Sequence, residues 1–326
     1  MKKKFNTIIY LFLSVFSCVL FALCSSGTSA EEYYSIGMAY YEMGKYDEAQ
    51  RWLSRAVGKN KTLRASEYNL GRIAFETGRY TDASKYFSRI LKKDPKNVMA
   101  LQAEAYTQIK LGNLEEAEKY YKSVLELQPE NADSGYNHAL ILFAMDKPAE
   151  AEETLLKYEY QLEENKENLL LFARVQKAQK KVEAIDSFDK WLQKYDDPVV
   201  RYEYACVLEE GNFYAKALEE IKTAVKNFTS DTAALSKVTV RFELAKIMLI
   251  ADPKNDDGIT ELTEVLKEGF KDEDAINALI KNEQLPKTRQ DEIKRLYDAH
   301  IKEETDKSTE SSKNAATSTN STSSSS

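Results

Sequence analysis

The chain is poor in the residues that build catalytic and metal centres and in those that break helices. Its 326 residues include 3 Cys, 2 His, 6 Pro and 11 Gly. Cys206 is the one cysteine beyond residue 30, so neither an internal disulfide nor a zinc-type cysteine cluster is expected. His138 and His300 have no companion at metal-ligand or triad spacing. The sequence therefore predicts no catalytic residues, no cofactor and no bound metal.

One acidic loop carries part of a calcium-binding spacing. In residues 253–264, "PKNDDGITELTE", the oxygen-bearing residues Asn255, Asp257 and Glu264 fall at ligand positions. Pro253 holds the first ligand position and has no side-chain oxygen. A plain turn between two helices is expected here instead.

The shortage of proline and glycine also argues against a β-rich fold, because turns between strands depend on these residues. The chain is rich instead in Lys, Glu, Ala, Leu and Tyr, a composition that favours helices. Its formal net charge is −7. An acidic chain lacks the basic stripe that binds a phosphate backbone, so nucleic acid is not an expected partner. The expected fold class is all-α.

The one long hydrophobic run lies at the N-terminus, where three lysines precede the apolar segment 5–24 and small residues lead to Ala30. This order is typical of an export signal, and cleavage after Ala30 is the first expectation. The run is also long enough to span a bilayer, so an uncleaved anchor is the second. Lipidation of Cys24 is the third, because Leu23 in front of it fits a lipoprotein leader poorly. Each alternative places the rest of the chain in the periplasm or cell envelope, with association to the membrane through this segment in the last two.

The sequence after the leader repeats with a period of 34 residues. Two series keep this step: Gly44, Gly78 and Gly112, and also Ala49, Ala83 and Ala117. Each period reads as an amphipathic helix, a glycine turn and a second helix. A fixed period of this length is typical of stacked repeats, in which each unit buries its apolar face against the next.

Residues 30–227 resemble the tetratricopeptide repeat, a helix–turn–helix unit. The family pattern combines a small residue in the first helix, a turn glycine, an alanine and an aromatic residue in the second helix, and a closing proline. The second unit supplies Gly71, Gly78, Tyr80, Ala83, Phe87, Ile90 and Pro95. The first and third units keep this register, whereas later units depart from it, with Asp146 and Pro148 in the fourth turn. The resemblance implies a right-handed superhelical solenoid whose concave groove is lined by first helices.

These patterns predict four segments. They are a signal peptide or membrane anchor at 1–30, an array of six to seven repeats at 31–270, capping helices at 271–303 and a disordered Ser/Thr-rich tail at 304–326. The tail has almost no apolar content to bury. The last capping helix carries an apolar stripe and a charged opposite face, as the end of a repeat array requires.

The resemblance places positions 2, 5, 9, 12 and 13 of each unit on the groove. The residues predicted to bind a partner are Tyr34, Tyr41, Tyr68, Arg72, Phe75, Tyr106, Tyr136, Phe143 and Tyr202. Phe242 continues the aromatic series in the seventh unit, and Arg174 adds a positive charge. A tyrosine ring combines an apolar face with a polar tip and has few torsions to freeze, which suits recognition of a peptide or helix. Packing between neighbouring first helices is the alternative interpretation for each residue taken singly.

The expected function is that of a non-enzymatic extracytoplasmic scaffold that binds a partner protein or peptide in this aromatic groove. Two alternatives stay open. The first is an accessory component of a transport or lipid-handling system that holds a small apolar ligand. The second is a structural subunit of an envelope complex that uses its convex face. The carboxylate clamp found in some members of the family is not expected, because Asn69 alone matches its residues.

Overall fold

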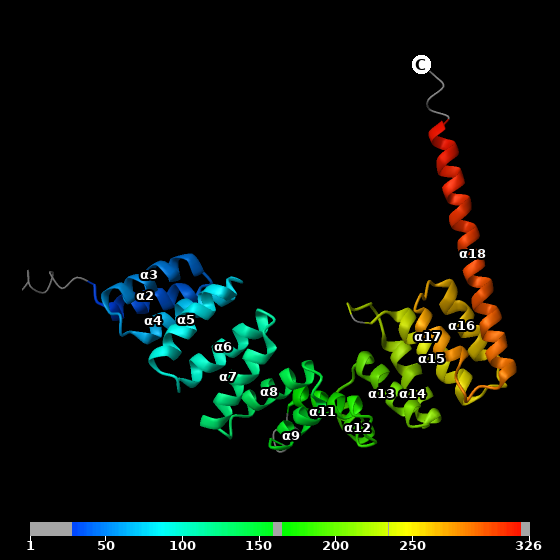
Figure 1. Ribbon diagram of the computed structural model, residues 1–326, viewed down its shortest axis with the longest axis horizontal. Helices are drawn as coiled ribbons and strands as arrows, with labels where there is room; N and C mark the ends of the chain where they lie inside the picture. Colours follow the sequence, from blue (N-terminus) through cyan, green and yellow to red (C-terminus); the bar gives the residue numbers. More distant parts are fainter. Residues whose placement is uncertain (1–27, 159–164, 234, 321–326) are drawn as a thin grey trace, which may run out of the picture. The chain divides into compact units, whose positions relative to one another are not determined.

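The computed structural model describes residues 28–158, 165–233 and 235–320, and this part of the chain is α-helical without a strand (Figure 1). The predicted all-α class is therefore confirmed. All but the last three residues of the predicted leader lie outside the described residues. Within the described part, no helix combines the length and the apolar character needed to cross a membrane.

Fourteen of the described helices form seven consecutive pairs. The pairs are α2 (Ala30–Glu42) with α3 (Tyr46–Lys59), α4 (Arg64–Glu76) with α5 (Tyr80–Lys93), α6 (Val98–Lys110) with α7 (Leu114–Leu127), α8 (Ala132–Ala144) with α9 (Pro148–Leu156), α11 (Lys166–Ala178) with α12 (Ala184–Lys194), α13 (Pro198–Glu210) with α14 (Tyr214–Asn227), and α15 (Lys237–Ala251) with α16 (Asp257–Lys267). After them come α17 (Glu273–Ile280) and α18 (Lys287–Asn320).

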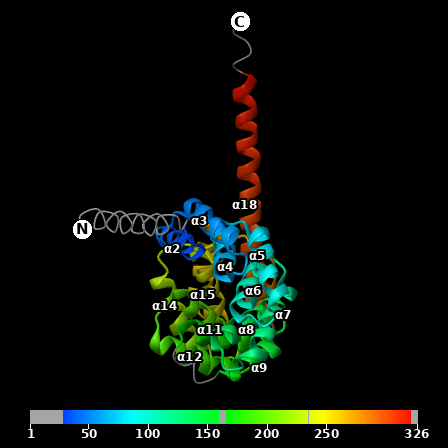
Figure 2. The ribbon, with the colours of Figure 1, turned by 90° about the vertical axis from the view of Figure 1, so that its left-hand side faces the viewer.

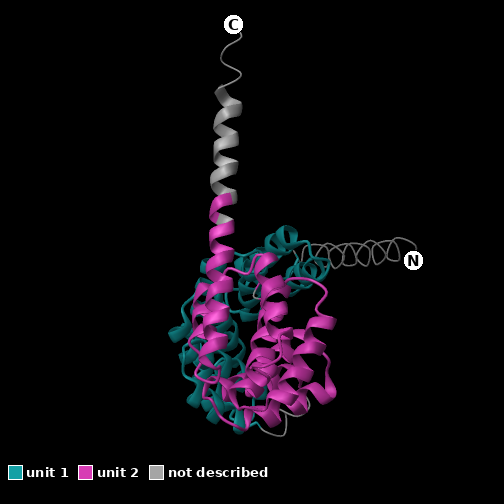
Figure 3. Cartoon of the chain, turned by 90° about the vertical axis from the view of Figure 1, so that its right-hand side faces the viewer, with its two compact units in different colours: residues 1–161 teal, residues 162–326 magenta. Residues whose placement is uncertain are grey.

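The chain divides into two compact units, residues 1–161 and 162–326 (Figure 3). In the first unit α3 packs on α4, α5 on α6 and α7 on α8, so each pair contacts the next. In the second unit α12 packs on α13 and α14 on α15 in the same way. The predicted solenoid of stacked helix pairs is thus found within each unit.

The two helices of a pair approach closely where the first helix carries a glycine. A Cβ atom on Gly71 would lie 2.6 Å from Cε1 of Phe87, and one on Gly135 would lie 2.1 Å from Cε2 of Tyr158. Both distances are far inside van der Waals contact. A side chain of any size at these positions would push the paired helices apart.

The turns inside six of the pairs share one backbone geometry. The residues with positive φ are Gly44, Gly78 and Gly112 in the first three turns, and Asp146, Lys180 and Asn212 in the next three. In each turn the following residue donates its N–H to the carbonyl five positions earlier, as Lys181 N does to Gln176 O at 3.1 Å. The turn therefore persists after glycine is lost, although the left-handed backbone is strained for a residue such as Lys180.

The second unit ends in α17 and α18. Side chains of these helices and of their connection join the apolar cluster of α15 and α16: Ile276, Leu279, Leu285 and Ile293. α18 continues to Asn320, whereas the sequence predicts disorder from residue 304 onward. A low apolar content does not by itself exclude a helix that extends from an already anchored turn. Residues 321–326 lie outside the described residues.

A buried carboxyl group lies at the contact between the second and third pairs. Glu104 of α6 accepts hydrogen bonds at Oε1 from Ser84 Oγ (2.6 Å) and Gln108 Nε2 (2.7 Å). Its other oxygen, Oε2, is buried without a hydrogen-bond partner among the described residues. Burial raises the pKa of Glu104 above its usual value. One repeat later, His138 and Glu118 occupy the equivalent positions, and burial lowers the pKa of His138.

Replacing Glu104 by glutamine is expected to stabilise the first unit at pH 7 by roughly 1 kcal/mol. The raised pKa means that the protonated carboxyl fits the site, so its contribution is complete below the unfolded-state pKa and is lost as pH rises through the folded-state pKa. Urea unfolding at pH 7 and at about pH 4 measures this, and the advantage of Glu104→Gln should shrink at the lower pH. Glu115→Gln, at an exposed position on α7, is the control. A Glu104→Gln variant less stable than the wild type at pH 7 would contradict the prediction.

Candidate functional site

Three of the predicted binding residues lie around one hollow in the first unit, bordered by α2, α4 and the start of α6. The hollow has a volume of about 320 Å³ and is lined by Tyr34, Met38, Arg64, Ala65, Tyr68, Asn69, Arg72, Ile90, Asn97 and Met99. Met99 is 59% exposed, so apolar surface of the lining faces solvent. Within the described residues, the lining includes two arginines and no carboxylate.

Asn69 connects the polar groups of this hollow. Its Nδ2 donates to Tyr34 OH at 3.3 Å and to Ala65 O at 2.9 Å, and its Oδ1 accepts from Arg72 Nη1 at 3.2 Å. The Arg72 guanidinium also lies over the ring of Tyr41, 4.7 Å from its centroid. Arg72 is therefore held in place by an amide and a ring and keeps further N–H donors for a ligand.

The two arginines differ in how they are paired. Arg64 Nη1 lies 2.9 Å from Asp94 Oδ2, so its charge is balanced within the protein. Arg72 takes part in no ion pair found among the described residues, although the Arg72 charge lies beside the Tyr41 and Tyr68 rings. Burial raises the pKa of both tyrosines, so both hydroxyls stay protonated at neutral pH. The positive charge available to a ligand in the hollow is thus that of Arg72.

Phe75 and Tyr106 form a separate aromatic contact between α4 and α6. Their ring centroids are 5.2 Å apart, and Phe75 also lies 5.2 Å from Tyr80. Lys110 Nζ lies over the Tyr106 ring at 5.4 Å. Phe75 thus packs between helices, while Tyr106 keeps 44% of its surface exposed.

The other predicted residues lie outside the hollow. Tyr136 and Phe143 are half-buried on α8. Tyr202 lies on α13 in the second unit, where burial raises the pKa of its hydroxyl. Phe242 is buried and stacks on Phe270 with ring centroids 4.1 Å apart, so the prediction that the aromatic series continues on the groove surface is wrong at this residue. Phe270, the residue after the Gly269 turn, covers the ring of Phe242.

First-helix residues of the second unit carry ion pairs that are closed within the protein. Arg174 Nε and Nη2 donate to the two carboxylate oxygens of Glu203 at 2.8 and 2.7 Å. Lys246 Nζ lies 2.9 Å from Glu243 Oε1 and 3.3 Å from Glu209 Oε2. Arg174 is therefore already bound by a carboxylate, contrary to its predicted availability for a ligand.

Neither thiol nor metal chemistry is supported by the described residues. Burial raises the pKa of the Cys206 thiol to about 12, so the thiol stays protonated and unreactive at physiological pH. No group of three or more His, Cys, Asp and Glu side chains in this part of the chain could hold a metal ion.

Two stretches of the chain match family models for the tetratricopeptide repeat, residues 34–98 and residues 108–167. Together they cover most of the helix pairs of the first unit and every lining residue of the hollow except Met99. The chain is a tetratricopeptide repeat protein. The resemblance noted in the sequence is confirmed.

The chain is similar to several solved structures, one of which, a tetratricopeptide repeat protein, shares the fold over most of the chain. One from Parabacteroides merdae has 20% sequence identity and a TM-score of 0.55, covering 78% of this chain and 98% of its own. YrrB, described as having an unusual peptide-binding site, has 18% identity and a TM-score of 0.49 over 53% of this chain and 91% of its own. MamA has 18% identity and a TM-score of 0.48 over 52% of this chain and 92% of its own. No curated protein matches the chain.

Seven of the ten lining residues were not among the predicted binding residues: Met38, Arg64, Ala65, Asn69, Ile90, Asn97 and Met99. Met38 and Met99 occupy groove positions 9 and 2 of their repeats, so the register of this tetratricopeptide repeat protein could have located them. The predicted binding set is made of aromatic side chains and one arginine, so it contains no methionine. Arg64 precedes the groove positions of its repeat, and its place depends on how the connection from α3 enters α4, for which the sequence has no signal.

Proposed function

We propose that this protein is a non-enzymatic scaffold that holds a segment of a partner protein in the hollow between α2, α4 and α6. The observation that carries the proposal is the combination of an exposed apolar lining with one available guanidinium, that of Arg72. Methionine adapts to varied apolar side chains, and tyrosine adds a rigid ring with a polar tip. Repeat folds of this kind commonly use such concave surfaces for binding.

Binding at this site requires no catalytic step and no covalent bond to the partner. An apolar side chain of the partner would enter beside Met38 and Met99 and displace water from their surfaces. A carbonyl or carboxylate oxygen of the partner would accept hydrogen bonds from Arg72, which Asn69 and Tyr41 already orient. On the first helices of the second unit, Arg174 and Lys246 are already paired with carboxylates.

We further propose that the scaffold acts outside the cytoplasm, in the periplasm or cell envelope. The support is the order of three lysines, the apolar segment 5–24 and small residues before Ala30. Fusion of residues 1–40 to a reporter enzyme that is active only after export tests this, and a cytoplasmic fusion product would contradict it.

Photo-crosslinking in the native cells tests the binding proposal. A photoreactive amino acid at Ala65, an exposed residue of the lining, should capture a partner protein that mass spectrometry identifies. Met99→Glu should reduce this capture about 10-fold or more, because it places a charge in the apolar lining. Met43→Glu is the matched control: Met43 is 58% exposed and does not line the hollow.

Equal capture of the partner by the wild type and by Met99→Glu would contradict binding in the hollow. Capture of lipid without protein would favour the small apolar ligand instead. Both variants change exposed methionines, so their helical melting curves should match that of the wild type.

A further inference from the structure

His138 lies at the contact between the third and fourth helix pairs of the first unit, where α8 packs on both α7 and α9 (Figure 2). Leu70 holds the same position in the second repeat and is buried. The side chain of His138 is 12% exposed, and both of its ring nitrogens are buried without a hydrogen-bond partner among the described residues. The imidazole is therefore packed as an apolar side chain would be, although histidine is the side chain that gains a proton closest to neutral pH.

A second hollow, with a volume of about 470 Å³, lies beside His138 and is bordered by α7 and α9. Its charged lining consists of four carboxylates and two ammonium groups, those of Glu118, Lys122, Glu126, Glu150, Glu153 and Lys157. We call this site the acidic hollow. Lys157 Nζ lies 3.2 Å from Glu153 Oε1, so one of the two lysines is already paired with a carboxylate. The excess of carboxylates favours a cation inside the acidic hollow.

The place that the imidazole occupies does not suit its protonated form. An imidazolium has two N–H donors and needs an acceptor for each of them. Glu118 Oε1 lies 3.5 Å from Nε2 and accepts no hydrogen bond from it, while Nδ1 has no acceptor among the described residues. Burial accordingly lowers the pKa of His138, and the charges of Lys122 and Lys157 add to this effect, whereas Glu118 opposes it.

The acidic hollow offers the protonated ring a better place. His138 is itself part of the lining, so a change of side-chain rotamer moves its ring toward the carboxylates. In that position the two N–H groups can donate to carboxylate oxygens or to water. The volume that the ring leaves between α7 and α8 then has no side chain to fill it, and a cavity at a helix contact lowers its stability.

We propose that His138 is an acid-sensitive latch between the third and fourth helix pairs. At neutral pH the uncharged imidazole fills the contact between α7 and α8. On acidification the imidazolium turns into the acidic hollow, and the fourth pair opens more often from the third. The fourth pair is the last described pair of the first unit, so it can open while the earlier pairs stay stacked. This inference is independent of the hollow between α2, α4 and α6 and of its ligand.

Amide hydrogen exchange of the full chain, measured by mass spectrometry and corrected for the intrinsic effect of pH on exchange, tests the latch. Because the pKa of His138 is lower in the closed contact than in the opened one, the contact is fully stable above about pH 6.5 and loses stability as pH falls toward the pKa of the buried ring. From neutral pH to about pH 5, exchange in α8 and α9 of the wild type should therefore become about 10-fold faster.

Two variants remove the proton acceptor. His138→Leu introduces the residue type found at the same position of the second repeat, and His138→Gln keeps a polar but uncharged side chain. Exchange in α8 and α9 of both variants should be the same at the two pH values. His300→Gln changes the other histidine of the chain, on α18, and should respond as the wild type does. Glu104 lies at the contact between the second and third pairs, so its own titration does not mask the opening of the fourth pair.

Equal acceleration in the wild type and in both His138 variants would overturn the proposal, because the acid response would then come from other groups. Unchanged or slower exchange in the wild type at the lower pH would overturn it as well, since it would indicate that Glu118 pairs with the imidazolium while the contact stays closed. Loss of the acid response in His300→Gln would do the same, because it would assign the proton to the other histidine.

Discussion

Replacing Gly135 by alanine is expected to lower the free energy of unfolding of the first unit by about 2–3 kcal/mol. The new Cβ would lie 2.1 Å from Cε2 of Tyr158 and 2.6 Å from Cζ. Tyr158 is buried, and its hydroxyl donates to Pro129 O at 2.7 Å. The ring is therefore buried and fixed at its hydroxyl, so relief requires moving α8 away from the end of α9. Urea denaturation followed by circular dichroism measures the loss.

The same substitution at Gly58 is the matched control. Gly58 lies exposed in α3, and a Cβ there would meet no atom within 4 Å. Gly58→Ala should therefore stabilise the unit by about 0.5–1 kcal/mol, because alanine restricts the unfolded chain and favours the helix. Adding Tyr158→Leu to Gly135→Ala should recover part of the loss, since leucine lacks the clashing ring atoms. If Gly58→Ala and Gly135→Ala changed the free energy of unfolding in the same direction, the close approach of α8 to Tyr158 would not be what requires glycine at position 135.

The parts of the fold that the sequence predicts are those set by the repeat register. Glycines at a constant step mark the first three turns, and their positive φ values follow from the need to reverse the chain. The later turns could not be predicted from residue type, because Asp146, Lys180 and Asn212 adopt the same backbone without being glycine. Their geometry is imposed by the packing of the paired helices, which overrides the local preference.

The candidate site was predictable only in part. Repeat positions placed Tyr34, Tyr68 and Arg72 on one surface, and the structure brings them to a common hollow. The same positions did not show that the series ends in the core at Phe242, because the covering ring of Phe270 belongs to the connection after α16. The division into two units near residue 161 has no compositional signal either.

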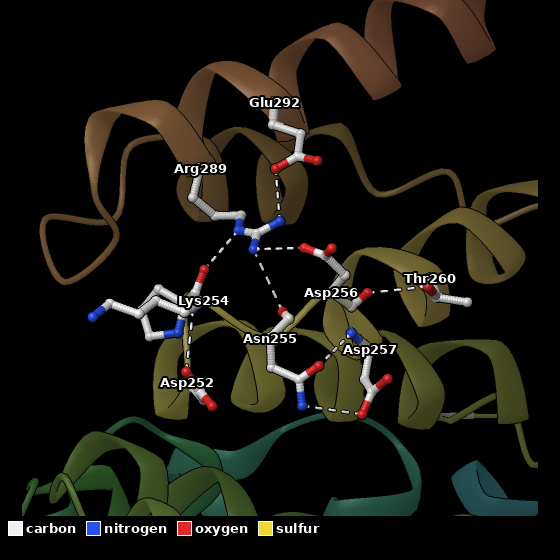
Figure 4. Close-up of polar contacts among 9 residues, drawn as sticks. Asp252, Lys254, Asn255, Asp256, Asp257, Thr260, Arg289 and Glu292 are labelled. Carbon is white, nitrogen blue, oxygen red and sulfur yellow. Dashed lines mark hydrogen bonds and ion pairs between the residues drawn. The ribbon is translucent and has the colours of Figure 1, made fainter.

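Arg289 fixes the last helix to the turn between α15 and α16, the stretch whose spacing resembles a calcium loop (Figure 4). Its Nε donates to Pro253 O at 2.9 Å, and its Nη2 contacts Asp256 Oδ1 at 3.0 Å and Asn255 O at 3.5 Å. Its Nη1 donates to Glu292 Oε2 at 2.6 Å. The positive group that meets this loop is therefore the guanidinium of Arg289, a residue that is only 7% exposed.

Arg289→Met should destabilise the second unit by about 3 kcal/mol. The variant leaves the carbonyl oxygens of Pro253 and Asn255 without their donor and removes the bridge to Asp256. Hydrogen exchange should report the loss first in the opening turns of α18 and in residues 252–257, because Arg289 joins these two segments. Urea unfolding gives its magnitude.

Two variants distinguish the contribution of the planar set of N–H donors of Arg289 from the contribution of its positive charge. Arg289→Lys keeps the charge, but an ammonium group cannot reach the loop oxygens and Glu292 together, so it should recover less than half of the lost stability. Arg295→Met removes an exposed arginine from the same helix and should change stability by no more than about 0.5 kcal/mol. If Arg289→Met proved as stable as Arg295→Met, the cap would be held by Ile293 and its apolar neighbours alone. Full recovery in Arg289→Lys would instead indicate that charge, rather than the planar set of donors, holds the loop against α18.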